Sequence, residues 1–190
     1  QVVLVIAEAA PNTGFYSWLI PTILTPSSNY QIRVTRNDNA TLTDTSNSTF
    51  TIAAPINVFY VNDGVVSGGD WTTAIGNNAN DGLTPATPKA SIGALLAAYD
   101  LNPGDVIRVD AGTYPLGVNI VLTASMSGIT IEGYHNPAFP SRHALIDRGN
   151  ISFGSSAFDL QNTSGVTLDH LWVTGGYSAV YAATNANNTG

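Results

Sequence analysis

The three histidines are the residues best suited to metal binding or proton transfer, because the chain contains no cysteine. His135, His143 and His170 do not form an H-E-x-x-H motif, and the nearest pair lies eight residues apart. This spacing argues against a zinc site. Asp169 and His170 fall on a predicted strand, where neighbouring side chains point to opposite faces. We therefore expect His170 to be a hydrogen-bonded structural residue and not a general base.

A second candidate is the pair Asp147–Arg148, which follows two apolar residues and could present a carboxylate and a guanidinium from one turn. Proton abstraction next to a carboxylate needs both a positioned base and a group that neutralises the developing charge. One neighbouring pair does not supply that set. The pattern favours a solvated ion pair, which contributes about 0–1 kcal/mol to stability.

The segment Asn77–Gly82 is rich in oxygen ligands and ends in glycine, as calcium-binding loops do. It lacks a leading aspartate, however, and it has Ala79 at a ligand position and Pro88 where a bidentate glutamate belongs. We therefore expect Asx-turns that order the loop, without calcium. The single lysine, Lys89, follows proline and not glycine, which excludes a P-loop, and the sequence has no G-x-S-x-G motif.

Four aromatic residues could stack on sugar rings or pack in the core, and the sequence leaves both interpretations open. They are Trp71, Trp172, Tyr177 and Tyr181. No set of residues fills all the roles that catalysis would need. We therefore assign no catalytic, cofactor-binding or metal-binding residue within the 190 residues.

The composition limits the partners and the location of the protein. Charged residues make up 10% of the chain and the formal net charge is −7, so five arginines and one lysine cannot form the basic stripe that nucleic-acid binding requires. No apolar run approaches the roughly 20 residues of a membrane-spanning helix. A polar, weakly charged chain without cysteine is typical of an exported β-rich protein, and we expect an extracellular or cell-surface location. The chain opens on Gln1 and not on methionine, and we expect it to be a piece of a longer protein.

Residues 1–54 are predicted to form short strands separated by turns. Apolar runs or period-two alternation mark four strands, over residues 2–7, 15–20, 30–35 and 50–52. Tyr30 is placed to bond back to upstream backbone, as a tyrosine does at the corner of an immunoglobulin-like sandwich. Such a sandwich needs about seven strands, so the missing strands would lie upstream of Gln1.

Three motifs in this part of the chain carry a resemblance to a known family. They are Asn12-x-Gly14-x-Tyr16-x-Trp18-x-x-Pro21, Tyr30-x-Ile32-x-Val34 and Asp44-x-Ser46-x-x-x-Phe50-x-Ile52. They resemble the second half of the immunoglobulin-like domain of the Ser-Thr-rich GPI-anchored family, which is named after yeast cell-wall β-glucan synthesis proteins. That domain is also an accessory module in large bacterial surface proteins. The resemblance implies that residues 1–54 are the C-terminal half of an Ig-like β-sandwich.

After the linker Ala53–Pro55 the composition changes, and residues 55–190 form the second predicted domain. Its one convincing helix is marked by apolar residues at i, i+3, i+4 and i+7, which are Ile92, Leu95, Leu96 and Tyr99. Ser91 or Thr87 can cap the start of this helix, and Asn102-Pro103-Gly104 stops it.

Short strands then repeat along the chain. Ser127–Glu132 and Ser164–Asp169 are near copies that lie 37 residues apart, and Phe158 and Val180, each opening a strand-like stretch, lie 22 apart. Similar strand units at a spacing of about 20–45 residues indicate a solenoid. We expect Val106–Val109 and the two copies to pair in one parallel stack.

Motifs from Phe59 onward carry a second resemblance. They are Tyr60-Val61-Asn62, Asn80-Asp81-Gly82, Thr84-Pro85, Thr87-Pro88, Ser91-Ile92, Pro103-Gly104-Asp105, Gly112-Thr113-Tyr114 and the run from Ser127 to Tyr134. This part of the chain resembles the opening of a right-handed parallel β-helix of the pectate-lyase-like superfamily. The resemblance implies an all-β protein in which a partial Ig-like sandwich is followed by the first coils of a β-helix, with the one short helix as its N-terminal cap.

The superfamily includes polysaccharide lyases, epimerases and fructotransferases, but also adhesins and phage spikes, so the fold does not decide the function. The resemblance implies an exported or cell-surface protein whose β-helix binds or processes polysaccharide, for example a cell-wall glycan. Lyases of this superfamily use a Lys or Arg base and often calcium, so any calcium and any active site would belong to parts of the full-length protein outside these residues. The alternative is a non-catalytic stalk or adhesin solenoid. The sequence does not predict an oligomeric state.

Overall fold

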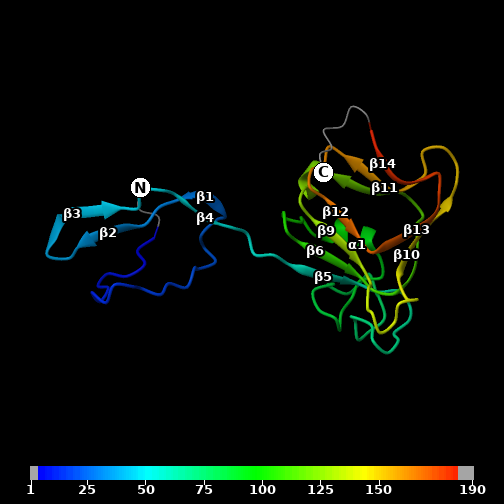
Figure 1. Ribbon diagram of the computed structural model, residues 1–190, viewed down its shortest axis with the longest axis horizontal. Helices are drawn as coiled ribbons and strands as arrows, with labels where there is room; N and C mark the ends of the chain where they lie inside the picture. Colours follow the sequence, from blue (N-terminus) through cyan, green and yellow to red (C-terminus); the bar gives the residue numbers. More distant parts are fainter. Residues whose placement is uncertain (1–3, 184–190) are drawn as a thin grey trace. The chain divides into compact units, whose positions relative to one another are not determined.

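The chain divides into two compact units, Gln1–Pro55 and Ile56–Gly190. The computed structural model describes residues 4–183 (Figure 1). Strands make up most of the regular structure, and the described residues contain one α-helix and one short 3₁₀ helix, Ala124–Met126. The protein is therefore mostly β, as the sequence predicts.

The first unit contains two pairs of antiparallel strands. They are β1 (Ser27–Tyr30) with β4 (Phe50–Ile52), and β2 (Arg33–Arg36) with β3 (Asn39–Thr45). The strands predicted over 2–7 and 15–20 are not formed by residues 4–7 or 15–20, and residues 1–3 lie outside the described part. Neither described run has a strand beside it to satisfy its backbone groups. An extended apolar run without a partner strand stays irregular.

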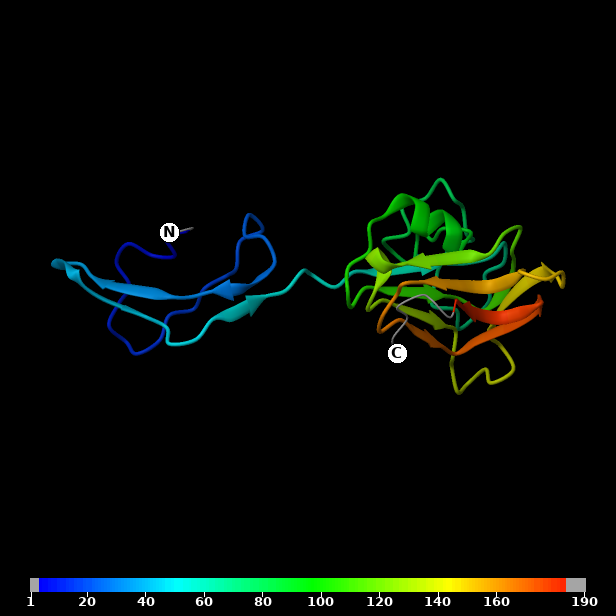
Figure 2. The same ribbon diagram turned by 90° about the horizontal axis from the view of Figure 1, so that it is seen from above.

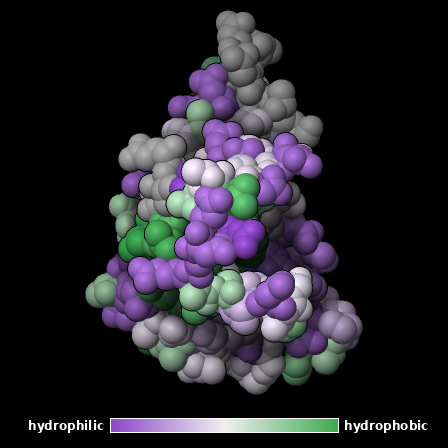
Figure 3. Space-filling model, turned by 90° about the vertical axis from the view of Figure 1, so that its left-hand side faces the viewer, coloured by the Kyte–Doolittle hydropathy of each residue, from purple (hydrophilic) through white to green (hydrophobic). Residues whose placement is uncertain are grey.

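Tyr30 makes the contact that its position predicts, because its hydroxyl donates to the carbonyl oxygen of Thr25 at 2.7 Å. Little of the first unit is enclosed, however. Among residues 4–55 the buried apolar side chains are Leu24 and Ile52, and green apolar patches interrupt the hydrophilic surface seen in Figure 3. Leu19 is 92% exposed. Two isolated strand pairs are too narrow to cover an apolar face from water.

The second unit is built from three parallel sheets (Figure 2). The first sheet contains β5 (Val58–Val61), β6 (Val106–Val109), β9 (Thr130–Gly133) and β12 (Thr167–Asp169). The second contains β7 (Gly112–Pro115), β10 (Ala144–Asn150) and β13 (Leu171–Gly176). The third contains β8 (Ile120–Thr123), β11 (Ser156–Gln161) and β14 (Ser178–Ala182). From β6 onward, consecutive strands belong to the first, second and third sheet in turn, and this order repeats. We call each set of three consecutive strands one round of the chain.

The register of these strands confirms the repeats predicted from the sequence. Thr130–Glu132 pairs with Thr167–Asp169, and β6 pairs with β9, so the three predicted strands lie in one parallel stack. Phe158 pairs with Val180 in the third sheet. One sequence repeat therefore corresponds to one round of the chain.

The core of the second unit lies between the sheets. Ile107 of β6 lies beside Ile131 of β9, and both side chains are fully buried. The third sheet contributes Phe158, which is also 0% exposed. Because side chains alternate along a strand, the neighbours of these residues point outward, which leaves Arg108 and Glu132 on the outer face of the first sheet.

Helix α1 (Ile92–Ala98) begins at the cap that the sequence suggests. The hydroxyl of Ser91 accepts the backbone N–H of Ala94 at 3.2 Å, which satisfies one of the unpaired donors at the helix start. Thr87, the other candidate cap, instead donates its hydroxyl to a carboxylate in the preceding loop. The helix ends before the predicted stop at Asn102.

The apolar face of α1 is confirmed. Ile92 and Leu95 are buried in the core, and Leu96 and Tyr99 are partly buried against it. The ring of Tyr99 lies 4.9 Å from the ring of Phe59 in β5, measured between their centres. The helix therefore packs on the first strand of the parallel stack.

Candidate functional site

A pocket of about 350 Å³ on the second unit brings together all three histidines of the chain. It lies where the loop between β9 and β10 meets the turn between β12 and β13. Its lining includes Tyr134, His135, Arg142, His143, His170 and Trp172. Residues from two successive rounds of the chain therefore meet in one pocket.

Two pairs of rings stack in this pocket. The centre of the His143 ring lies 3.7 Å from that of Trp172, with 10° between the planes, and the centres of His135 and His170 lie 4.1 Å apart, with 25°. The fold brings these residues close together, because neighbouring parallel strands lie about 4.8 Å apart and Trp172 of β13 pairs with Leu145 of β10, two residues after His143. Trp172 remains 59% exposed. The pocket thus presents an indole that is open to solvent.

His170 is held in a turn and not on a strand. β12 ends at Asp169, and His170 has a φ of 49°, in the left-handed region. The predicted alternation is wrong for this reason: the two side chains do not face opposite ways, and an Asp169 carboxylate oxygen lies 2.8 Å from His170 Nδ1. The turn also comes close to Gly133, where a Cβ atom would lie 2.2 Å from the carbonyl oxygen of His170. Glycine at this position allows the His135–His170 stack to form.

Trp71 packs beside the pocket from the long loop that follows β5. Its ring centre lies 5.3 Å from Tyr134 and 5.4 Å from His135, and the Arg108 guanidinium lies 5.4 Å from the same ring. Trp71, His135 and His170 thus form one group of neighbouring rings, and His143 with Trp172 forms a second group in the same pocket as the two histidines. We call Trp71, His135, His143, His170 and Trp172 the aromatic platform.

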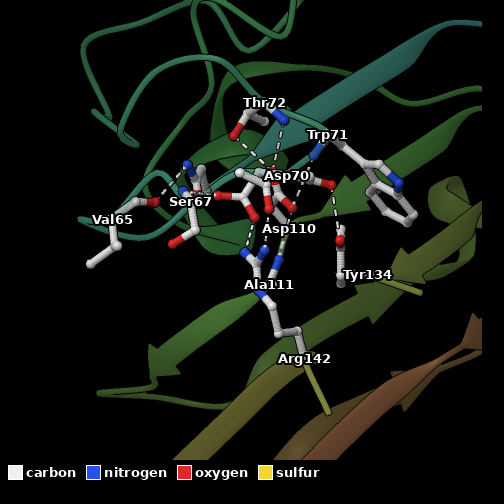
Figure 4. A network of polar contacts seen from close by, with 12 residues as sticks. Val65, Ser67, Asp70, Trp71, Thr72, Asp110, Ala111, Tyr134 and Arg142 are labelled. Carbon is white, nitrogen blue, oxygen red and sulfur yellow. Dashed lines mark hydrogen bonds and ion pairs between the residues drawn. The ribbon is translucent and has the colours of Figure 1, made fainter. Parts of the chain in front are cut away.

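Asp110 fixes the backbone that carries Trp71 (Figure 4). Its completely buried carboxylate accepts the backbone N–H groups of Trp71 at 3.2 Å, Thr72 at 2.7 Å and Ala111 at 2.9 Å. The hydroxyl of Thr72 donates to it as well, at 2.7 Å. A buried carboxylate is tolerated only when it is paired in this way. Asp110 is therefore an anchor for the platform, and the sequence analysis did not single it out.

Arg142 joins two loops at the edge of the pocket, as Figure 4 shows. Its guanidinium forms an ion pair with Asp70 and donates to the carbonyl oxygen of Gly68 at 2.9 Å. It also lies 5.2 Å from the ring centre of Tyr134, whose hydroxyl donates to the carbonyl oxygen of Gly69 at 2.9 Å. The Asp70 side chain is 2% exposed. This Arg142–Asp70 clasp holds the Trp71 loop against the loop between β9 and β10.

The pair Asp147–Arg148 does not form the solvated ion pair that the sequence suggests. Arg148 is 8% exposed, and its Nε donates to Oδ1 of Asn119 at 2.9 Å. Its Nη1 donates to the carbonyl oxygen of Leu116 at 3.3 Å, and Asp147 accepts the N–H of Gly149. Burial turns the arginine inward toward loop acceptors, so the two charges separate. Neither residue lines the pocket.

The segment Asn77–Gly82 contains the expected Asx-turns. Asn77 Oδ1 accepts the N–H of Ala79 at 2.9 Å, and Asp81 Oδ1 accepts the N–H of Leu83 at 3.1 Å. The hydroxyl of Thr87 donates to the same Asp81 oxygen, and this bond, followed by the bond from Leu83, lowers the pKa of the Asp81 carboxyl. Asn77 Oδ1 and Asp81 Oδ1 are thus used within the loop, while Asn78 Oδ1 accepts the N–H of Ala90 at the start of the helix region.

The Lys89 ammonium occupies the position in this loop where a metal cation could otherwise bind. The side chain is largely buried, and its Nζ donates to the carbonyl oxygens of Asn78 at 3.1 Å and Asn80 at 2.6 Å. Backbone carbonyls are the groups that a calcium ion would use. The ammonium therefore supplies hydrogen bonds to the two carbonyl oxygens that a calcium ion would use.

We expect EDTA to leave the melting temperature unchanged and added calcium chloride not to raise it, because Lys89 already satisfies these carbonyls. Lys89→Met removes the charge but keeps most of the side-chain length, and it should cost about 1–3 kcal/mol by leaving two carbonyls unpaired. Differential scanning calorimetry of both proteins measures the two effects. A wild-type melting temperature that rises with calcium would contradict this prediction.

Tyr177 and Tyr181 lie outside the pocket. Tyr177 is 59% exposed and its ring packs edge-on against Phe153, with 5.3 Å between the centres. Tyr181 is 52% exposed on β14. The structure therefore brings Trp71 and Trp172 to one side of the molecule but leaves the two tyrosines elsewhere.

Within residues 4–183, no group of three or more His, Asp or Glu side chains is arranged to hold a metal ion. No helix in the same range is long and apolar enough to cross a membrane. Comparisons with known protein families, curated proteins and solved structures found no match for this chain. Function must therefore be inferred from the side chains themselves.

Proposed function

We propose that the second unit is the opening of a right-handed parallel β-helix and that the first unit is part of an Ig-like sandwich, both within a longer exported or cell-surface protein. The repeated order of the three sheets supports the β-helix. Crossover connections between parallel strands of one sheet are right-handed in about 98% of cases. Helix α1 then caps the first coil and protects its edge. The hydrogen bond from Tyr30 to Thr25 supports the Ig-like corner.

The second unit binds polysaccharide on the aromatic platform. The stacking of His143 on Trp172, with the indole left open, is the observation that carries this proposal. An aromatic face packs against the apolar C–H side of a sugar ring, while nearby polar groups bond to its hydroxyls. Arg142 and the imidazoles of the pocket supply such groups. A surface built only to stack coils would not need an open indole beside a pocket.

Binding without turnover is the activity that the pocket residues favour. The carboxylates near the platform are already bonded within the protein: Glu132 accepts from Arg108 at 3.0 Å, Asp169 contacts His170, and Asp110 accepts backbone N–H groups. The charge of Arg142 is paired with Asp70, and Arg148 does not line the pocket. Proton abstraction from a sugar needs a base and a charge-neutralising group that face the same atom. The platform presents aromatic rings for stacking and no such pair of a base and a charge-neutralising group.

Trp172→Ala tests the proposal. We expect the variant to bind soluble polysaccharides at least about tenfold more weakly than the wild type, because it loses the largest stacking surface. Tyr177→Ala is the matched control, since Tyr177 is equally exposed but lies outside the pocket. Affinity electrophoresis against a panel of plant and microbial polysaccharides measures both variants. Failure of the wild-type chain to bind any polysaccharide would favour the stalk or adhesin alternative.

A further inference from the structure

The charges around the aromatic platform nearly cancel. Arg142 forms an ion pair with Asp70, whose side chain is 2% exposed, and Arg108 Nε lies 3.0 Å from an oxygen of Glu132, which is 19% exposed. Each guanidinium near the platform therefore has a dedicated carboxylate. A positive charge that is already paired inside the protein attracts a second anion only weakly.

Asp169 adds a negative charge to the same surface. Its side chain is 47% exposed, and it contacts the imidazole of His170 and no guanidinium in the described residues. Two guanidinium groups and four carboxylates, including the buried carboxylate of Asp110, thus lie around the platform, on a chain with a formal net charge of −7. A polyanion would approach this surface against a like charge.

From this balance we infer that the platform takes a neutral glycan and not a polyuronate or a sulfated polysaccharide. The inference rests on the proposed function, since it names the class of ligand for the same site. Arg142 reaches the pocket with guanidinium N–H groups beyond those used by Gly68 and Asp70. These groups would donate to uncharged sugar hydroxyls, while the rings pack on the C–H face of the sugar.

The wild-type chain is titrated at pH 8 with soluble β-glucan, galactomannan and arabinoxylan, and with polygalacturonate and alginate. We expect at least one neutral polymer to bind, with an affinity that changes less than about twofold between 20 and 500 mM NaCl, because no counter-charge is screened. Tighter binding of polygalacturonate or alginate than of every neutral polymer would overturn the inference but leave the proposed function intact. Failure of both classes to bind would contradict the proposed function itself.

Asp70→Asn gives a sharper test, because it frees the charge of Arg142 and nearly preserves the shape of the side chain. We expect the affinity for polygalacturonate to rise at least about fivefold, as one removed like charge at short range contributes about 1 kcal/mol. Asp38→Asn removes the same charge from an exposed ion pair in the first unit and should have no effect. Asp169→Asn, which leaves the buried clasp untouched, should shift the affinity in the same direction as Asp70→Asn. No gain in either folded variant would overturn the inference.

Discussion

Replacing Leu95 with alanine is expected to lower the free energy of unfolding of the second unit by about 2–5 kcal/mol. Leu95 is 0% exposed in α1 and belongs to the core cluster that includes Phe59 and Val61. Alanine would leave a cavity that closely packed neighbours cannot fill. Urea unfolding followed by tryptophan fluorescence measures the change, because Trp71 and Trp172 both report on this unit.

Ile151→Ala is the control for this experiment. The substitution removes the same number of carbon atoms from the second unit, but Ile151 is 78% exposed. We expect its effect to stay within about 0.5 kcal/mol. Equal losses for both variants, or no loss for Leu95→Ala, would show that α1 does not cap the parallel stack.

A second large effect is expected at Gly76. A Cβ atom at this position would lie 1.8 Å from the backbone oxygen of Asn62 and 2.7 Å from Cα of Ala90. The segment cannot easily move away, because the N–H of Gly76 donates to the carbonyl oxygen of Asp63 at 2.7 Å. Gly76→Ala should therefore cost about 3 kcal/mol or more.

Gly93→Ala is the matched comparison for Gly76→Ala. Gly93 lies in α1, and a Cβ atom there would meet no atom within 4 Å. Alanine has the higher helix propensity, so this variant should be more stable than the wild type by about 0.5–1 kcal/mol. The same urea unfolding experiment measures both substitutions. We expect the two substitutions to change the free energy of unfolding in opposite directions. A destabilised Gly93→Ala would contradict the helix environment described above.

Much of the second unit can be predicted from its sequence because its interactions repeat. The copies at Ser127–Glu132 and Ser164–Asp169 carry the same alternation, and parallel pairing places equivalent residues side by side. Helix α1 follows from a four-residue apolar face and a serine cap, both of which are local signals. The pairing of Phe158 with Val180 follows from the same repeat.

The first unit shows the limit of such local signals. The apolar runs over 2–7 and 15–20 have the composition of strands, but a strand forms only where a partner satisfies its backbone. Residues 4–7 and 15–20 have no partner strand within the described chain. Tyr30 is a different case, because its bond to Thr25 spans only five residues and needs no distant partner.

The aromatic platform was not predictable from the sequence, because it depends on contacts between successive rounds of the chain. His143 and Trp172 meet only because β10 pairs with β13, and His170 reaches His135 only through a left-handed turn. The Arg142–Asp70 clasp joins residues 72 positions apart. A possible signal was the presence of all three histidines between residues 135 and 170 of a repeating region.

Titrating the ¹⁵N-labelled chain with a soluble neutral glycan tests the proposed binding site most directly. The three tryptophans give separate indole N–H signals, of which Trp71 and Trp172 report on the platform and Trp18 reports on the first unit. We predict that the signals of Trp172 and Trp71 shift in a saturable manner while the signal of Trp18 stays in place. A shift confined to Trp18, or no shift of any indole signal across the neutral polymers, would contradict glycan binding on the aromatic platform.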